Sequence, residues 1–390
     1  MKRERTDRRR TNAWNRQVRR TPFLVRLRNK VLTVAVAGFI TAFASADAHS
    51  FSRRYCKHHP SQCQTTSTTT TTSTTSTAPP PPSTCTKTLT SGSVTTFVNN
   101  LAPGEVGCLS GSFAENVKIS NPGITLTSAP GRTATLAGRL WVSSAATDVT
   151  VSSLFLNGRN VGGGTLPSPT INGDRVTFSD NEVTNFHTGI CFSVGSTPAE
   201  GPWGVPSDVL IERNRIHDCG RLPLMNHDHG VYVDSARNTI IRNNYIYDNA
   251  DRCVQLYPDA QGTLVENNVM DGCGEGGNFG GDVLSGINYA SSNNTYRHNI
   301  ISNANWRFLV ESYWGGTVGT GNVVIENCLW PTNSRSDYYN TNDGIDLSSG
   351  GFTVAANIKA DPLYVDRAAK NFALQPSSPC VGYGPQSAGP

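Results

Sequence analysis

Six short segments of one pattern recur along the chain, and this repeat constrains the fold more than any other feature. They read DNEVTN, RNRIHD, NNYIYD, ENNVMD, RHNIIS and ENCLW, with an Asn or a substitute two places before an apolar residue. That apolar residue is Val183, Ile216, Ile246, Val269, Ile300 and Leu329, and an earlier copy places Leu156 in the same role. The intervals of 33, 30, 23, 31 and 29 residues indicate a stack of similar units.

A second motif gives each repeat two or three short β runs. It reads GICF, GVYV, CVQL, GINY and GIDL. The period is too short for a propeller blade. Leucine-rich repeats are excluded because their Leu-rich consensus is absent, and helical repeats because the 3.6-residue periodicity is absent. A parallel β-helix remains, whose coils stack at ~4.8 Å and bury an apolar column. Asn suits its corners, because Asn tolerates the left-handed conformation and stacked amides bond to each other.

These residues resemble the secreted bacterial right-handed parallel β-helix proteins often called pectate-lyase-like. The resemblance covers Cys85 to Tyr383, with NPGITLTSAPG and TATLAGR similar to first coils and ADPLYVDRAAKNFALQPSSPCVGYG similar to a closing segment. It implies an all-β fold, a right-handed parallel β-helix that is a single-stranded solenoid. It does not fix the activity, because the sequence lacks the motifs of the better-defined families. Missing are the N-T-D, D-D, G-H-G and R-I-K set of polygalacturonases, the D-P-H-D motif of mannuronan epimerases and the W-x-D-H signature of the main pectate-lyase family.

The first part of the chain predicts export and a spacer. Residues 1–48 have an Arg-rich lead, an apolar stretch from Val31 to Ala46 that is too short for a membrane span, and A-x-A cleavage patterns. Residues 49–64 form a short Cys-containing segment, residues 65–84 a disordered Thr/Ser/Pro-rich linker, and residues 85–390 the β-helix domain. We expect a secreted or cell-surface protein with no membrane span after signal cleavage; a retained anchor is the alternative.

Charge and cysteine content narrow the partners and the compartment. Residues 1–30 hold 12 of the Lys and Arg residues, which leaves 21 basic and 27 acidic residues in 31–390, a net charge of −6. A broad nucleic-acid surface is therefore not expected, and we predict a monomer that contacts an extracellular polysaccharide.

Ten Cys favour an oxidising exterior. We expect a Cys85–Cys108 bridge first, then Cys328–Cys380 and a Cys56–Cys63 loop; the connectivity of the other four, Cys191, Cys219, Cys253 and Cys273, cannot be read from the sequence.

Alternation within the strand motif predicts a row of side chains on the outer face. Its third residue points outward, which gives the column Cys191, Tyr232, Gln255, Asn288, Glu311 and Asp346. Insertions at residues 219–229, 272–282 and 331–343 are expected to build a wall beside this face, so that a groove forms there.

The densest chemistry lies in NHDHGVYVD and in DRCVQLYPD one coil further on. We predict the catalytic residues His227, Asp228, His229, Arg252 and Tyr232. We predict the substrate-binding residues Gln255, Tyr257, Asp259, Asn288, Glu311, Arg307 and Trp314. A His, Arg and Tyr set suits β-elimination on an acidic polysaccharide, in which a cation neutralises the sugar carboxylate, a base removes a proton and an acid protonates the leaving oxygen.

Several alternatives stay open. A glycoside hydrolase would need two carboxyl groups, roughly 5 Å apart for retention or about 6.5–9.5 Å for inversion, drawn from Asp228, Asp259, Asp282 and Glu311. A non-catalytic module that binds glycan or cell wall is another alternative, and a purely structural or adhesive solenoid is a third. The two histidines equally suit hydrogen bonds at a coil corner. No metal site is assigned, although Ca²⁺ at Asp228, Asp259 or Asp282 would suit an acidic sugar.

Overall fold

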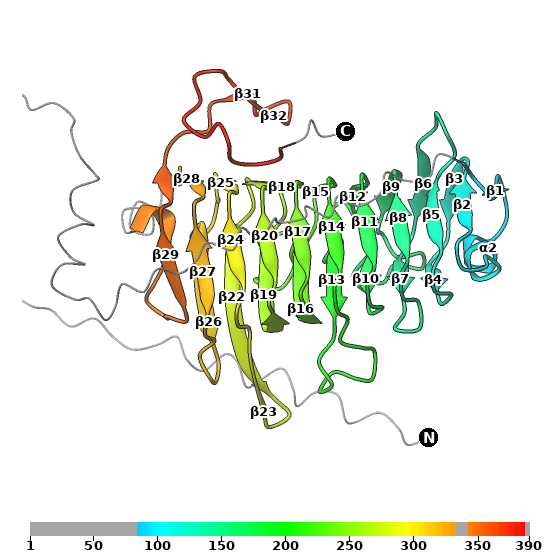
Figure 1. Cartoon of the computed structure of the whole chain (residues 1–390), viewed down its shortest axis with the longest axis horizontal. Coiled ribbons are helices and arrows are strands. Elements are labelled where there is room, and N and C mark those ends of the chain that lie inside the picture. Colours follow the sequence, from blue (N-terminus) through cyan, green and yellow to red (C-terminus); the bar gives the residue numbers. More distant parts are fainter. Residues whose placement is uncertain (1–83, 333–341, 387–390) are drawn as a thin grey trace, which may run out of the picture. The chain divides into compact units, whose positions relative to one another are not determined.

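The computed structural model describes residues 84–332 and 342–386, and they form a parallel β-solenoid of about 9 turns with almost no helix (Figure 1). The predicted export region, the Cys56–Cys63 loop and the linker lie outside the described residues. So does most of the predicted insertion at 331–343. The all-β parallel β-helix predicted from the repeat is confirmed.

Three long sheets run along the solenoid, one strand per coil in each. Sheet A contains β1 (Lys87–Leu89), β2 (Val106–Leu109), β5 (Thr125–Ser128), β8 (Thr150–Ser152), β11 (Thr177–Ser179), β14 (Leu210–Glu212), β17 (Ile240–Arg242), β20 (Leu264–Glu266), β24 (Thr295–Arg297), β27 (Asn322–Ile325) and β29 (Phe352–Ala355). Sheet B contains β3 (Ser112–Ala114), β6 (Ala134–Ala137), β9 (Leu154–Asn157), β12 (Glu182–Thr184), β15 (Arg215–His217), β18 (Tyr245–Tyr247), β21 (Val269–Asp271), β25 (Ile300–Ser302), β28 (Cys328–Trp330) and β30 (Ile358–Lys359).

Sheet C carries the longest strands. It contains β4 (Val117–Ile119), β7 (Leu140–Val142), β10 (Thr170–Ile171), β13 (Phe192–Gly195), β16 (Val231–Arg237), β19 (Arg252–Gln261), β22 (Glu275–Leu284) and β26 (Val310–Trp314), with β23 (Ile287–Ala290) paired antiparallel to β22. The β22–β23 hairpin and the connection after β13 extend beyond the same ends of these strands (Figure 1). Side chains facing inward from the three sheets form one buried apolar core along the axis.

A ladder of asparagines, all buried except the last, fixes the register of the coils. The amide Nδ2 of each donates to Oδ1 of the next at 2.9–3.0 Å, across sequence separations of 33, 30, 24, 31, 28 and 30. Its members are Asn181, Asn214, Asn244, Asn268, Asn299, Asn327 and Asn357. The predicted Asn corner is therefore confirmed. At two coils, however, the apolar residue predicted to follow the Asn was placed one residue too early in the sequence. The ladder uses Asn268 and Asn299, so Met270 and Ile301, not Val269 and Ile300, stack with Ile246 and Leu329.

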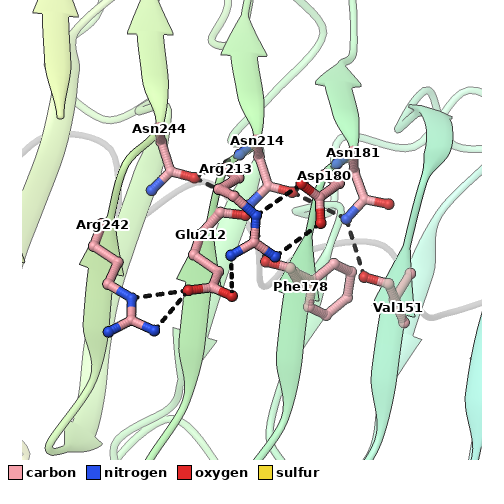
Figure 2. A network of polar contacts seen from close by, with 9 residues as sticks. All are labelled: Val151, Phe178, Asp180, Asn181, Glu212, Arg213, Asn214, Arg242 and Asn244. Carbon is pink, nitrogen blue, oxygen red and sulfur yellow. Dashed lines mark hydrogen bonds and ion pairs between the residues drawn. The ribbon is translucent and has the colours of Figure 1, made fainter. Parts of the chain in front are cut away.

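Ion pairs join neighbouring coils beside this ladder (Figure 2). Arg213 donates through Nε and Nη2 to both oxygens of Asp180, at 2.8 and 2.9 Å, and through Nη1 to Glu212. Glu212 is buried and also accepts from Arg242 at 2.8 Å. Because a buried carboxylate needs compensating partners, two arginines on successive coils suit this position.

Short elements and disulfides hold the two ends of the solenoid. Helix α2 (Val94–Asn99), capped by Ser93, buries Val94 and Val98 at the first coil, and the predicted Cys85–Cys108 disulfide is present. At the other end lies the 3-10 turn η2 (Asn342–Gly344). The antiparallel pair β31 (Tyr364–Asp366) and β32 (Asn371–Leu374) packs against sheet B through Phe372, and the predicted Cys328–Cys380 disulfide ties this segment to β28.

Candidate functional site

The outward column of sheet C differs from the predicted one at two positions. Strand register aligns Ser193, Tyr232, Gln255, Asn278 and Glu311. Tyr232, Gln255 and Glu311 are where the alternation placed them. Cys191 is wrong, because it precedes β13 and is buried in a disulfide with Cys219. Asn288 is also wrong, because it lies in the antiparallel strand β23.

The Gly-rich stretch 272–282 explains the second error. It was predicted as an insertion, yet residues 275–282 belong to β22, the strand of that coil. A Cβ on Gly277 would lie 2.7 Å from the ring of Tyr296, and one on Gly276 would lie 2.4 Å from a methyl group of Ile301. Large side chains from sheets A and B fill the interior beside Gly276 and Gly277, so glycine suffices at the start of the strand, and Phe279 is the side chain of β22 in the core. The alternating pattern is therefore absent.

Two of the predicted catalytic residues organise a loop. Asp228 is buried, and its carboxylate accepts from Nε and Nη2 of Arg221 and from the Arg221 amide. Burial raises the pKa of Asp228, but the hydrogen bonds from Arg221 outweigh burial and lower it. The backbone amides of His227 and Asp228 both donate to Asp251 at 2.7 Å. These contacts fix the connection between β15 and β16.

His229 lies two residues before β16, beside two other predicted catalytic residues. Its ring lies 5.6 Å from that of Tyr232, and its Nδ1 accepts from the Arg252 amide at 3.4 Å. Burial lowers its pKa well below the usual value, and the positive charge of Arg252 adds to this. The imidazole is therefore neutral at pH 7. Of the five predicted catalytic residues, His229, Tyr232 and Arg252 are neighbours.

A buried ionic cluster continues from Arg252 across three coils. Arg252 lies 2.8 Å from Glu275 and 3.5 Å from Glu311, and Arg307 lies 2.7 Å from Glu311 and 3.5 Å from Glu275. Burial raises the pKa of Glu275 to about 8, because it outweighs the opposing effect of Arg252. Asn278, 0 % exposed, lies in the column between Gln255 and Glu311, and both atoms of its amide lack a hydrogen-bond partner.

A second cluster lies further along the same strands. Asp234 follows Tyr232 by two residues on β16, where the register of the strand shifts, and the two side chains lie close enough to influence each other's pKa. Glu200, an exposed residue of the connection after β13, contacts Asp234. Burial, followed by the negative charge of Glu200, raises the pKa of Asp234 well above its ordinary value. Asp234 therefore keeps its proton at pH values where most carboxyl groups have lost theirs.

Tyrosines and a third carboxyl group continue this cluster on the next coils. Tyr257 donates its hydroxyl to Asp282 at 2.6 Å. Its pKa is raised by burial, then by Asp282, with smaller effects of Tyr313 and Asp234. Tyr313 is 49 % exposed. We call this set the tyrosine–carboxyl face; it comprises Glu200, Tyr232, Asp234, Tyr257, Asp282 and Tyr313.

The remaining predicted binding residues are held elsewhere. Asp259 accepts from Arg237, Ser235 and Gln261 at the end of β19. Trp314 packs against the core and donates Nε1 to the Gly350 carbonyl at 3.1 Å. Tyr257, Gln255, Arg307 and Glu311 lie in or beside the two clusters described above.

No group of three or more His, Cys, Asp or Glu side chains within residues 84–332 and 342–386 is arranged to hold a metal ion. The three aspartates considered for calcium, Asp228, Asp259 and Asp282, are engaged with Arg221, Arg237 and Tyr257 respectively. In the same described ranges, no helix is long and apolar enough to cross a membrane.

Sequence reasoning missed Glu200 and did not assign Asp234. The sequence could have indicated Asp234, because it stands two places after Tyr232 in a strand motif, and alternation predicts the same outward face for both. Glu200 had none, because it lies in the connection between β13 and β14, and only the folded path of that segment brings it to β16.

Comparison with protein families agrees with this architecture. A family model described as "Right handed beta helix region" matches residues 170–358. No curated protein matches the sequence. Among solved structures, the chain is similar to the Dettilon tailspike protein (gp208), at 13 % identity and a TM-score of 0.39, covering 66 % of this chain and 55 % of the tailspike.

Two further structures show the same likeness. The lacto-N-biosidase of Eubacterium ramulus has 12 % identity and a TM-score of 0.37, with 67 % of this chain and 63 % of that chain covered. Pectate lyase Pel9A has 12 % identity and a TM-score of 0.41, with 76 % and 87 % covered. The chain thus spans less than two thirds of the tailspike and of the biosidase. The solenoid geometry shows the right-handed parallel β-helix fold, and the family model matches its central part.

Proposed function

We propose that this protein is an exported, carbohydrate-active β-helix protein that hydrolyses a glycosidic bond on the tyrosine–carboxyl face. The observation that supports this most is Asp234, a carboxyl group that keeps its proton to unusually high pH and lies beside other carboxyl groups and tyrosines. Glycoside hydrolysis needs such an acid to protonate the leaving oxygen, together with a second carboxylate.

In this proposal Asp234 is the general acid, and Glu200 helps to keep it protonated. Glu200 contacts Asp234 directly, which leaves no room for a sugar between them. Asp282 is therefore the better second carboxylate: it binds the hydroxyl of Tyr257, which lies on the coil next to Asp234. Asp282 would either attack the sugar as a nucleophile or activate a water molecule as a base; the separation of the two carboxyl groups decides between these roles.

The tyrosines suit sugar binding. Tyr232, Tyr257 and Tyr313 stand on β16, β19 and β26 of sheet C, with β22 between the last two, and Tyr313 is about half exposed. A tyrosine offers an apolar ring and a polar hydroxyl, which match the mixed surface of a pyranose.

Charge favours an uncharged sugar at the cleaved bond. The face carries three carboxyl groups, and the nearby Arg252 and Arg307 are both paired with glutamates. Glu200 and Asp282 place negative charge on this face, and like charges repel a carboxylated sugar there.

The test incubates purified protein with neutral and acidic polysaccharides and measures new reducing ends. We expect release from at least one substrate, and a fall of about 100-fold or more in kcat for Asp234→Asn. Asp208→Asn, an exposed aspartate away from the face, is the matched control and should retain full activity. Equal rates for wild type and Asp234→Asn would contradict the proposal.

β-Elimination on an acidic polysaccharide is the second candidate. The neutral His229 next to Tyr232, whose pKa is raised by burial and then by Asp234, provides a base and an acid in contact. This reaction would create an unsaturated uronate with a new ultraviolet absorbance, lost in His229→Ala and Tyr232→Phe. Hydrolysis gives reducing ends without that absorbance, so the same incubation distinguishes the two.

Binding without cleavage is the remaining outcome of this assay. Retained affinity for a polysaccharide with no product would select a non-catalytic glycan- or cell-wall-binding module. We further propose that the protein works outside the cell as a monomer; the four disulfides of the described residues are compatible with an oxidising compartment.

A further inference from the structure

The outward column of sheet C continues below Ser193 toward the first coils. Register aligns Lys118 with Trp141, Trp141 with Thr170, and Thr170 with Ser193, which pairs with Tyr232. Trp141 therefore lies three coils from Tyr232, about 14 Å at the ~4.8 Å spacing of neighbouring strands. A chain molecule lying along the column would meet both places.

Two tryptophans and two cations meet at this lower position, which we call the aromatic–cationic patch. Nζ of Lys118 lies 4.4 Å from the ring centroid of Trp141, and Cζ of Arg139 lies 5.2 Å from it. The ring of Trp203 meets that of Trp141 edge-on, with centroids 5.8 Å apart. Trp203 is 50 % exposed, a large apolar surface for one side chain to leave in water.

The charges of the patch are available to a ligand. Within the part of the chain that the structure describes, neither Lys118 nor Arg139 forms an ion pair with a carboxylate. Arg139 is instead held in place by the Pro167 carbonyl and the Thr170 hydroxyl. The patch is thus positive, whereas the tyrosine–carboxyl face is acidic.

One segment joins the two places. The connection between β13 and β14, residues 196–209, carries both Glu200, which contacts Asp234, and Trp203, which contacts Trp141. Its return path is fixed by hydrogen bonds from the Asn172 side chain and the Ser196 amide to the Gly204 carbonyl. Figure 1 shows this connection extending beyond the end of β13.

We propose that the aromatic–cationic patch binds an anionic sugar residue, carboxylated or sulfated, of the glycan that the protein processes. Trp203 would pack on the ring of this residue, and Lys118 with Arg139 would bind its anionic group. This inference rests on the proposed function in one respect, the position of the cleaved bond. Each coil rises by ~5 Å, about the length of one sugar in an extended chain, so the cleaved bond would lie about three sugar residues from the patch. The substrate would then carry its anionic group on a sugar about three residues from the cleaved bond, while the sugars at that bond would be uncharged.

The binding test uses the full chain and calorimetry with three probes: oligogalacturonate, its methyl ester, and chondroitin sulfate oligosaccharides. We expect a carboxylated or sulfated probe to bind at least about tenfold more tightly than the neutral ester. Trp203→Ala should weaken that binding about tenfold, and Lys118→Gln should weaken it and reduce its dependence on salt. Phe186→Ala, another exposed aromatic, and Arg132→Ala, another exposed cation, are matched controls and should bind like wild type. Circular dichroism checks that each variant is folded.

The outcomes separate this inference from the proposed function. The inference is overturned when neither anionic probe binds better than the ester, or when Trp203→Ala and Lys118→Gln bind like wild type. Binding that needs Trp203 without any cleavage supports the patch and removes the hydrolase. Cleavage that is equally fast and equally placed in Trp203→Ala supports the hydrolase and removes the patch. Mass spectrometry of the products locates the cut relative to the anionic residue.

Discussion

The carboxyl group of Asp234, at the outward face of strand β16, meets that of Glu200 from the connection that follows β13. Burial is the largest cause of the raised pKa of Asp234, and the negative charge of Glu200 is the next. Because the second cause comes from a side chain on a separate segment, it can be removed without changing the strand that positions Asp234.

The pH dependence of cleavage should therefore respond to Glu200. A general acid must be protonated, so kcat/KM should fall as pH rises through the pKa of Asp234 in the folded protein. Glu200→Gln removes a negative charge, lowers the pKa of Asp234 and should move this fall to lower pH. The measurement is a pH–rate profile of both proteins, with Asp208→Asn as control. A Glu200→Gln profile that superimposes on the wild-type profile would show that Glu200 does not tune the acid.

Asp228 should behave as a structural residue. Arg221 lowers its pKa despite burial, so the ion pair contributes stability above the pKa of the unfolded carboxyl, near 3.8, and that stability is lost as pH falls through the folded pKa. Asp228→Asn should lower the free energy of unfolding at pH 7 by about 1–3 kcal/mol and reduce the destabilisation by acid. Urea unfolding at pH 7 and pH 3 measures both effects. We expect kcat to change only a few-fold; a loss as large as that of Asp234→Asn would return Asp228 to the catalytic set.

The asparagine ladder should be least tolerant at its centre. Asn244 accepts from the backbone and side chain of Asn214 and donates to Asn268 and to the Ile211 carbonyl. Asn244→Ala removes its amide and leaves several buried groups unpaired, so we expect a loss of about 2–4 kcal/mol in the free energy of unfolding. Asn357→Ala, in the last and half-buried member, is the matched control and should cost clearly less. Similar losses at the two positions would mean that the ladder does not act as a unit.

This ladder also explains why the fold could be predicted from the sequence. A repeated side-chain bond needs the same residue at the same corner of each coil, and a regular spacing of Asn before an apolar residue is visible in one chain. The one-residue error at Val269 and Ile300 arose where two adjacent residues each satisfied the pattern, as in Asn267-Asn268. Only the hydrogen bonds decide between them.

The site could be predicted only in part, for a different reason. Tyr232 and Gln255 were placed correctly, because period-2 alternation holds wherever a strand shows apolar side chains. Asn278 was missed because β22 is glycine-rich and Tyr296 fills its interior. Asp228 was assigned to catalysis because His227 and His229 flank it, and its ion pair with Arg221, seven residues earlier, has no signal in the sequence. Contacts between segments decide such roles, and composition does not encode them.

Glu275 gives a final prediction, on stability. An unfolded glutamate ionises near 4.5, whereas burial keeps Glu275 protonated to about pH 8 despite Arg252. Between these values the folded state binds more protons than the unfolded state, so the free energy of unfolding should fall as pH rises, by at most about 1.4 kcal/mol per pH unit from this group. Glu275→Gln cannot ionise and should flatten this decline. Urea unfolding from pH 5 to pH 8 measures it, with Glu266→Gln, which removes a more exposed ion pair with Arg297, as control. An unchanged slope in Glu275→Gln would mean that Arg252 and Arg307 hold this carboxylate ionised throughout, and the buried cluster would then be a set of permanent ion pairs.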